Sequence, residues 1–321
     1  MRELSGRLAV ITGGGTGMGR ALARQLVAEG CHVAMCDIID ANLEASLALC
    51  REEAPQGVRV SGHRCDVASE GDIARFRDEV QTDHATDHIH LLFNNAGVGG
   101  GGSFVNSDRE EWERTFGICW NGVYLMCRLF LPLLMRAPEG HVINTSSVNG
   151  FRAALGANVP HSAYSAAKFA VKGFTEALIN DFRFNAPHLQ ASVVMPGYVG
   201  TGIARNTEAI LGANVMAGLS DAFIDAHRDQ YVEDGWLENR DAPADEIRAH
   251  LAGITETYDS AGMTPEDAAR VILAGVKADQ WRILVGDDAV VLDEAVRAAP
   301  ERTYDLDFFG SVIASEGMTD L

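Results

Sequence analysis

The chain has 321 residues, of which 47% are hydrophobic and 22% charged, a composition typical of globular proteins. Its formal net charge is −19, and such an acidic surface repels phosphate backbones, so we expect no nucleic acid partner. The amino terminus lacks a signal-peptide pattern, and no apolar run is long enough to span a bilayer. We therefore expect a cytoplasmic protein that does not enter a membrane.

The six cysteines form no CxxC pair and have no zinc-like spacing. In a chain without an export signal, we expect reduced and mostly buried thiols. These residues are Cys31, Cys36, Cys50, Cys65, Cys119 and Cys127.

Strands and helices alternate through the first half of the chain. Apolar runs predict strands over residues 7–12, 31–36 and 58–63, and helical patterns cover residues 20–29 and 41–53 between them. This alternation predicts βαβ units, and therefore a parallel sheet with helices on both faces.

A glycine-rich loop follows the first predicted strand and opens the first predicted helix. It runs from Gly13 to Gly19 with the spacing G-x-x-x-G-x-G. Backbone N–H groups at a helix N-terminus, with the positive end of the helix dipole, hold a pyrophosphate that side chains would block. We predict that this loop binds a dinucleotide, and the alternative is a tight connection without a ligand.

An acidic residue, Asp37, ends the second predicted strand, 18 residues after Gly19. A carboxylate at this point can accept hydrogen bonds from the adenosine ribose and would repel a 2′-phosphate. Neither Thr16 nor Ile38 supplies a cation for that phosphate. The pattern favours NAD over NADP, and the alternative is a turn aspartate that binds nothing.

The segment from Asp83 to His90 contains three histidines and two aspartates. Such a cluster suggests a metal site, but no further group of ligands in the sequence supports one. We interpret the segment as a polar loop before a buried strand over residues 91–93, and we predict no metal site.

The remaining elements follow the same alternation of strands and helices. Helical patterns cover residues 69–82, 108–135 and 264–278 and part of the tail, and strand patterns cover residues 141–145, 189–195 and 282–285.

Tyr164 and Lys168 are four residues apart, a spacing that places them on one face of a helix, one turn apart. A nearby ammonium favours the phenolate and lowers the pKa of a tyrosine. Such a tyrosine can take a proton from an alcohol or return one to a ketone. Taken alone, the pair also fits a helix with one snorkelling lysine.

Taken together, the motifs resemble the short-chain dehydrogenase/reductase family, in its compact single-domain branch with an extended carboxy terminus. The resemblance implies an α/β fold: a doubly wound parallel-sheet Rossmann fold of about seven strands, ordered 3-2-1-4-5-6-7, in one domain over residues 1–321. The motifs cover residues 5–205 in the order of the family: Thr12-Gly13-x-x-x-Gly17-x-Gly19, Asn94-Asn95-Ala96-Gly97, Asn121, Ser147, Tyr164-x-x-x-Lys168 and Pro196-Gly197.

The resemblance also implies catalytic roles. Tyr164 would be the general acid/base, and Lys168 would lower the tyrosine pKa and bind the nicotinamide ribose. Ser147 would hydrogen-bond the substrate oxygen, and Asn121 would hold a water that links Lys168 to solvent. Without the family, Ser147 is also consistent with a strand-end hydroxyl and Asn121 with a satisfied amide inside a helix.

Cofactor and substrate contacts follow from the same resemblance. Asp66 and Val67 would face the adenine, and Thr201 would touch the carboxamide. The full set of expected cofactor-binding residues is Thr12, Gly13, Thr16, Gly17, Met18, Gly19, Asp37, Asp66, Val67, Asn94, Ala96, Gly97, Tyr164, Lys168, Pro196, Gly197, Val199 and Thr201. The expected substrate-binding residues are Ser147, Asn149, Phe151, Tyr164 and Tyr198.

Some segments depart from the family pattern. Residues 151–161 are longer than usual, and residues 97–102 are unusually rich in glycine. Residues 205–262 form an insertion that we expect to act as a substrate lid, and residues 287–321 form a carboxy-terminal extension. The largely apolar stretch 209–224 predicts a hydrophobic pocket, unless it is ordinary helix core.

We therefore expect an NAD-dependent oxidoreductase that interconverts a hydrophobic secondary alcohol and its ketone. The alternatives are an NADPH-dependent biosynthetic ketoreductase and a catalytically silent relative that binds NAD(H) as a sensor or scaffold. The resemblance also implies a homodimer or homotetramer, formed through the helices that hold Asn121 and Tyr164.

Overall fold

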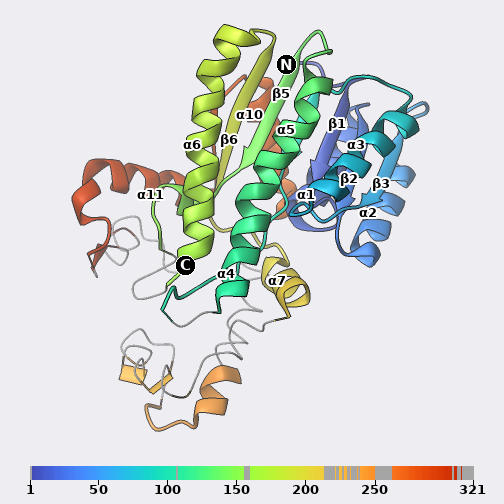
Figure 1. The fold of residues 1–321 in the computed structure, drawn as a ribbon. Helices are drawn as coiled ribbons and strands as arrows, with labels where there is room; N and C mark the ends of the chain where they lie inside the picture. Colours follow the sequence, from blue (N-terminus) through green and yellow to red (C-terminus); the bar gives the residue numbers. More distant parts are fainter. Residues whose placement is uncertain are drawn as a thin grey trace.

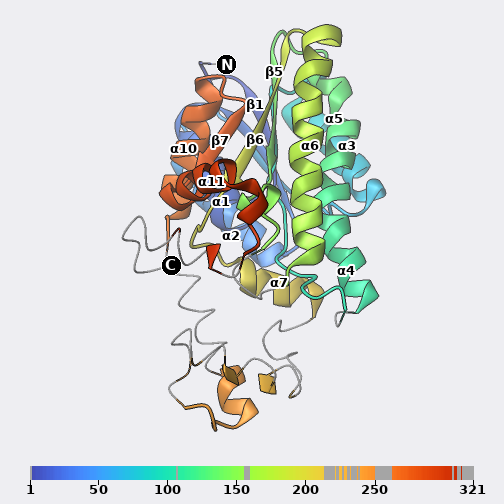
Figure 2. The same ribbon diagram turned by 90° about the vertical axis from the view of Figure 1, so that its left-hand side faces the viewer.

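A computed structural model gives the fold of the chain (Figures 1 and 2). Most of the expected lid and the end of the carboxy-terminal extension lie outside the described residues. The structure describes residues 2–105, 108–154, 160–212 and 262–305, together with residues 221, 224, 225, 228, 229, 232, 237, 239–249, 307, 308 and 312.

Seven parallel strands form one sheet in the order β3-β2-β1-β4-β5-β6-β7, which confirms the predicted fold class and strand order. The strands are β1 (Leu8–Thr12), β2 (His32–Asp37), β3 (Val60–Arg64), β4 (Leu91–Asn94), β5 (Gly140–Thr145), β6 (Leu189–Pro196) and β7 (Arg282–Val285).

Helices cover both faces of this sheet (Figure 2). The long ones are α1 (Gly17–Ala28), α2 (Asp40–Glu53), α3 (Glu70–His84), α4 (Arg109–Phe116), α5 (Gly122–Leu134), α6 (Ser162–Asn185), α7 (Ile203–Leu211), α10 (Pro265–Lys277) and α11 (Asp287–Ala298). Short turns are the π-helix η1 (Gly117–Asn121) and the 3-10 helices η2 (Val148–Gly150) and η3 (Pro300–Arg302).

The sheet separates two hydrophobic cores, because successive side chains of a strand point to opposite faces. In β1, Val10 joins the core beneath α3, α5 and α6, whereas Ala9 and Ile11 join the core beneath α1, α2 and α10. Every residue of β1 is buried, as expected for a central parallel strand. This two-sided burial fixes the carboxyl ends of the strands at one edge, where loops can meet around a ligand.

All six cysteines are free and buried, as the sequence predicts. Burial raises the pKa of Cys31 and Cys127 to about 12, so both remain thiols at neutral pH. These side chains fill the two cores as small apolar groups.

One continuous helix runs from Arg109 to Leu134 through α4, η1 and α5, close to the predicted bounds. Its length and composition would allow a membrane span, which corrects the expectation that no run of the chain is long enough. The most apolar window is 56% buried, because α5 packs against the sheet and α3 (Figure 1). Such burial is typical of a core helix.

A histidine lies buried at the start of β5. The Nε2 atom of His141 is 2.7 Å from Ser192 Oγ, and that hydroxyl donates to the carbonyl oxygen of Gln280 at 2.6 Å. His141 Nε2 therefore carries the proton, and among the described residues Nδ1 has no partner. Because burial disfavours the charged ring, the pKa of His141 falls from 6.5 to about 4.

This histidine should make the protein sensitive to acid. Its pKa is lower in the folded than in the unfolded chain, so acidification below pH 6.5 favours unfolding, and the loss is complete below about pH 4. Between pH 7 and pH 5, His141 alone should lower the free energy of unfolding by about 2 kcal/mol. Urea denaturation of wild type and His141→Gln at both pH values measures this difference, and equal pH dependence in the two proteins would contradict the assignment.

Candidate active site

The glycine-rich loop lies at the carboxyl end of β1 and leads into α1. Gly13 has φ +66°, and a Cβ there would lie 2.9 Å from the Cα of Ala96 in the loop after β4. A Cβ on Gly19 would lie 2.0 Å from the carbonyl oxygen of Gly13. Only glycine permits this contact between the loop, the start of α1 and the neighbouring strand end. The N-terminus of α1 is thereby left open to a phosphate group.

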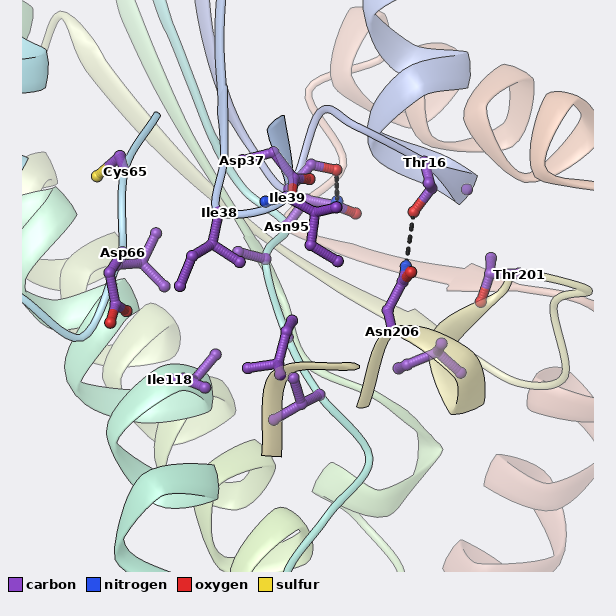
Figure 3. Close-up of a pocket in the computed structure, with 18 of the residues that line it drawn as sticks. Thr16, Asp37, Ile38, Ile39, Cys65, Asp66, Asn95, Ile118, Thr201 and Asn206 are labelled. Atoms are coloured by element: carbon purple, nitrogen blue, oxygen red, sulfur yellow. Dashed lines mark hydrogen bonds between the residues drawn. The ribbon is translucent and has the colours of Figure 1, made fainter. Parts of the chain in front are cut away.

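A pocket opens beside this loop at the carboxyl ends of the strands (Figure 3). Ten of the residues expected to bind the cofactor line it: Gly13, Thr16, Gly17, Met18, Asp37, Asp66, Val67, Ala96, Gly97 and Thr201. The sequence analysis did not assign the other lining residues, which are Ile38, Ile39, Cys65, Asn95, Val98, Arg114, Ile118, Ile203, Asn206 and Ile210.

Asp37 is held rigidly in the wall of this pocket. One carboxylate oxygen accepts a hydrogen bond from the backbone N–H of Gly15 at 2.9 Å, and the other accepts from the N–H of Ile39 at 3.0 Å. Figure 3 shows the side chain beside the glycine loop. The carboxylate therefore presents a fixed negative charge to a ligand in the pocket.

The one cation among the described lining residues is already paired. Arg114 Nη2 donates to the Asp66 carboxylate at 2.7 Å, across the pocket from the glycine loop. The second carboxylate oxygen of Asp66 accepts from the backbone N–H of Ala68 at 2.9 Å. These contacts hold Asp66 at the end of β3, beside the apolar wall formed by Ile38 and Val67.

Several expected cofactor residues lie behind the pocket instead. Thr12 Oγ1 accepts from the N–H groups of Asn95 and Ala96, both at 3.0 Å. Asn94 is buried and donates to Asn144 Oδ1 at 2.7 Å. Both side chains therefore position the loop after β4, and the nearest polar contact to the pocket comes from Asn95.

The loop after β6 is arranged in a similar way. The N–H of Gly197 donates to the carbonyl oxygen of Val285, and the N–H of Tyr198 donates to the carboxylate of Asp288. Pro196, Gly197 and Val199 are absent from the pocket lining within the described part of the chain. They place Thr201, which does line the pocket.

Tyr164 and Lys168 lie near the start of α6, and Ser147 precedes η2, which packs against the same helix. Lys168 Nζ donates to the carbonyl oxygen of Thr145 at 2.9 Å and lies 5.2 Å from the centre of the Tyr164 ring. Ser147 follows β5, and its hydroxyl oxygen accepts from the N–H of Asn149 at 3.1 Å. Lys168 is only 3% exposed, so this ammonium has a single well-defined location.

The structure does not bring Asn121 into this group, which corrects the assignment made from the sequence. Its side chain is exposed at the end of η1. Cys119, two residues earlier, is buried instead and donates to the carbonyl oxygen of Val98 at 3.3 Å. A Cβ on Gly97 would lie 3.6 Å from Lys168 Nζ and 3.7 Å from Cys119 Sγ, so the thiol and the ammonium face the same glycine.

The Cys119 thiol cannot take the water-holding role that was expected for the amide of Asn121. Burial raises the pKa of this thiol, and the positive charge of Lys168 offsets only part of that rise. The thiol is therefore neutral and a weak donor. A water that links Lys168 to solvent would need partners other than the Asn121 side chain.

His161 is a neighbour of Tyr164 that the sequence analysis missed. The two rings stack with their centres 4.5 Å apart and an interplanar angle of 12°. Burial lowers the pKa of His161 to about 4, so the imidazole is neutral at pH 7. Its Nε2 lies 3.2 Å from the carbonyl oxygen of Gly99. The stack restricts the orientation of the phenol.

The expected substrate residues divide into two groups. Asn149 is buried beside Ser147 and donates to Ser165 Oγ at 3.3 Å. Phe151 lies farther along, with the Arg282 guanidinium of β7 5.8 Å above its ring centre. Tyr198 also lies on that side, packed against Gly262.

Helix α7 closes over the pocket from the opposite side. Asn206 Nδ2 donates to Thr16 Oγ1 at 2.8 Å, as Figure 3 shows. The next residue, Thr207, accepts from the N–H of Gly99 at 2.8 Å. Two adjacent residues of α7 therefore contact the cofactor loop and the glycine-rich segment 97–102, respectively.

This arrangement fits a dinucleotide on a doubly wound sheet, with a tyrosine and a buried lysine close to the pocket. It defines the class of dinucleotide-binding oxidoreductases. The family model described as short chain dehydrogenase matches residues 7–210. The chain belongs to the short-chain dehydrogenase/reductase family.

Similar proteins support this membership over most of the chain. The oxidoreductase SadH of Mycobacterium tuberculosis (strain ATCC 25618 / H37Rv) is 31% identical over 297 residues, 92% of each chain. A family member from Burkholderia phymatum, solved with NAD, is 27% identical with a TM-score of 0.75, covering 94% of this chain and 96% of its own. A metagenomic short-chain oxidoreductase, solved with NADP, is 31% identical with a TM-score of 0.53, covering 61% and 84%.

The contact between α7 and the glycine loop should slow cofactor release. Replacing Asn206 with alanine removes one partly buried hydrogen bond, worth about 1 kcal/mol, so NADH should dissociate about fivefold faster. Stopped-flow displacement of bound NADH measures this rate. Asn185→Ala, an exposed change at the end of α6, serves as the control, and an unchanged or slower release from Asn206→Ala would contradict the role.

Proposed function

We propose that the protein is an NAD-dependent oxidoreductase that interconverts a hydrophobic secondary alcohol and its ketone. The observation that carries the proposal is the Ser147–Tyr164–Lys168 group beside a pocket whose wall presents the fixed carboxylate of Asp37. The carboxylate suits the adenosine ribose hydroxyls, and a 2′-phosphate would meet its charge at short range.

The residues of this chain would handle the proton. A bound nicotinamide supplies or accepts the hydride. In the oxidation direction, Tyr164 takes the hydroxyl proton of the alcohol, and it returns a proton to the ketone in reduction. Ser147 hydrogen-bonds the substrate oxygen, and Lys168 keeps a fixed positive charge beside the phenol.

Apolar side chains around the pocket support a hydrophobic substrate. Ile118 of η1, together with Ile203 and Ile210 of α7, lines its outer part. Much of the rest of the expected lid, including the largely apolar stretch 213–220, lies outside the described residues. An apolar pocket with few convergent polar groups is the usual environment of a hydrophobic substrate.

Similar proteins have been solved with each of the two cofactors, one with NAD and another with NADP. The relative solved with NAD matches nearly the whole chain, whereas the relative solved with NADP matches a shorter part. The paired state of Arg114 supports NAD, since a 2′-phosphate would find no unpaired cation among the described lining residues. Reduction with NADPH remains the alternative that the next experiment addresses.

Replacing Asp37 with alanine tests the cofactor preference. The loss of hydrogen bonds to a charged group should weaken NAD⁺ about tenfold or more, and the discrimination against NADP⁺ should relax. Fluorescence titration with NADH and NADPH gives both dissociation constants. Asp40→Ala, which removes an exposed carboxylate three residues later, is the matched control, and an unaltered preference in Asp37→Ala would exclude the proposed ribose contact.

Replacing Tyr164 with phenylalanine tests the chemistry. Turnover should fall by about 10²–10⁴-fold, because no general acid/base remains, while NADH should still bind. NADH absorbance is followed with NAD⁺ or NADP⁺ and a panel of aliphatic, alicyclic, aromatic and steroidal secondary alcohols. Tyr124→Phe, on the exposed face of α5, is the control, and near-normal turnover in Tyr164→Phe would rule out the proposed role.

A further inference from the structure

A second cavity, of about 180 Å³, lies at the amino ends of the strands, opposite the nucleotide pocket. It lies at the end of the sheet nearest the marked N-terminus in Figure 1. His32 begins β2, His90 immediately precedes β4, and His84 ends α3. Together with His88 and Arg59 they line the cavity, so the histidine-rich segment noted in the sequence gathers around one space.

Hydrogen bonds from backbone N–H groups determine which ring nitrogen carries the proton in His32 and His90. The N–H of Arg59 donates to His32 Nδ1 at 3.0 Å, and the N–H of Leu8 donates to His90 Nδ1 at 3.2 Å. A neutral imidazole that accepts at Nδ1 carries its proton on Nε2. Both rings therefore offer an Nε2–H donor, and neither donor has a protein partner in the described part of the chain.

This protonation disfavours a metal ion. A metal ligand must present an unprotonated nitrogen, and here the unprotonated Nδ1 atoms of His32 and His90 are occupied by backbone N–H groups. Within the described ranges, no group of three or more His, Cys, Asp or Glu has an arrangement that could hold a metal.

His84 provides an independent sign that the cavity is built for a ligand. The residue is only 7% exposed, yet its Nδ1 has no partner among the described residues. Its Nε2 lies 2.9 Å from Ser61 Oγ, which lies 2.8 Å from His63 Nε2. His63 Nδ1 in turn lies 2.9 Å from Glu79 Oε2. A buried polar row thus ends at a histidine that lines the cavity and has one unsatisfied ring nitrogen.

The charges around the cavity favour a negative ligand. No carboxylate is among the described residues that line it, whereas Arg59 lies at the rim and donates to the carbonyl oxygen of His84 at 2.6 Å. The nearby acids are already engaged: Asp87 with His88 at 2.9 Å, and Glu79 with His63.

We propose that this cavity binds a small tetrahedral oxyanion, such as phosphate or sulfate, through the Nε2–H groups of His32 and His90 and the guanidinium of Arg59. Such an anion accepts several N–H donors at once, and charge-assisted hydrogen bonds of this kind are the strong ones. Helix α3 ends at the cavity with its negative dipole end, and the contact of Arg59 with the final carbonyl group offsets that charge.

Anion binding should be coupled to proton uptake. Burial and nearby cations lower the pKa of His84 and His90 to about 4, so both are neutral in the free protein at pH 7. The groups that face them are Arg59, Arg7, His32, His63 and His88, opposed by Asp83. Nδ1 of His90 already accepts the N–H of Leu8, so a proton taken up with the anion would go to the unpartnered Nδ1 of His84, and the nearby negative charge raises the pKa of that ring.

The sign of the pH dependence follows from this coupling. The complex holds more protons than the free protein, so affinity rises as pH falls. The gain is up to about tenfold per pH unit for each proton taken up. Sulfate is the suitable probe, because it does not itself titrate between pH 6 and pH 8.

The test is a calorimetric titration of the full chain with sulfate at pH 6 and pH 8, at ionic strength matched with sodium chloride. NADH is present at saturation in one arm and absent in the other, because the N-terminus of α1 is a second possible anion site. We expect a saturable site that persists in the presence of NADH and binds sulfate more tightly at pH 6 than at pH 8. Sulfate binding that NADH abolishes would assign the anion to the glycine loop and overturn the proposal.

Variants separate the cavity from general charge effects. Arg59→Gln, an exposed change, should weaken sulfate at least about tenfold, and His84→Gln should reduce the pH dependence. Arg77→Gln removes the same charge from α3, where Arg77 pairs with Asp78, and should leave binding unchanged. Equal loss in Arg59→Gln and Arg77→Gln, unchanged binding in Arg59→Gln, or uptake of Zn²⁺ in place of sulfate would each overturn the proposal.

Discussion

Two hydrogen bonds between the end of β5 and helix α6 hold the proposed catalytic residues in place. Lys168 Nζ donates to the carbonyl oxygen of Thr145, and Ser146 Oγ donates to the carbonyl oxygen of Lys168 at 2.7 Å. A Cβ on Gly150 would lie 2.2 Å from Ser146 Oγ, so the chain after the strand must turn with glycine at this point. The strand end and the helix are thereby fastened to each other at the residue that carries the ammonium.

A buried ammonium is costly unless its donors are satisfied, because it loses the solvation of water. Lys168 has one carbonyl partner and an aromatic ring nearby, which leaves donors that a bound ribose and phenolate would complete. Lys168 therefore favours ligand binding through its remaining donors, and the same side chain lies beside the phenol of Tyr164. This links the stability of the site to its occupancy.

The sequence was sufficient to predict the strands and the two-sided core, because buried parallel strands leave strong apolar runs and glycine marks the helix start. The order of the strands came from the resemblance to the family. It also predicted the pairing of Tyr164 with Lys168, since four-residue spacing on a helix fixes a common face.

The sequence analysis failed for residues whose local geometry departs from regular helix or strand spacing. Asn121 was assigned by motif order, but it is exposed, and Cys119 two residues earlier faces the same glycine as Lys168. The stack of His161 on Tyr164 depends on the non-helical backbone of His161 at the N-cap of α6, and no periodic pattern predicts such a contact. Helix α7 and its contacts with Thr16 and Gly99 link segments that are far apart in sequence.

The adjacency of Asn206 and Thr207 on α7 has a thermodynamic consequence. One residue contacts the loop that faces the cofactor and the next contacts the loop beside Tyr164, so a displacement of the helix alters both sites. Any molecule that shifts α7 on binding changes the free energy of binding at the other site, and the reverse effect has the same magnitude. A substrate and a cofactor that both shift α7 would each change the affinity of the other by the same factor, so each affinity would depend on the concentration of the other ligand.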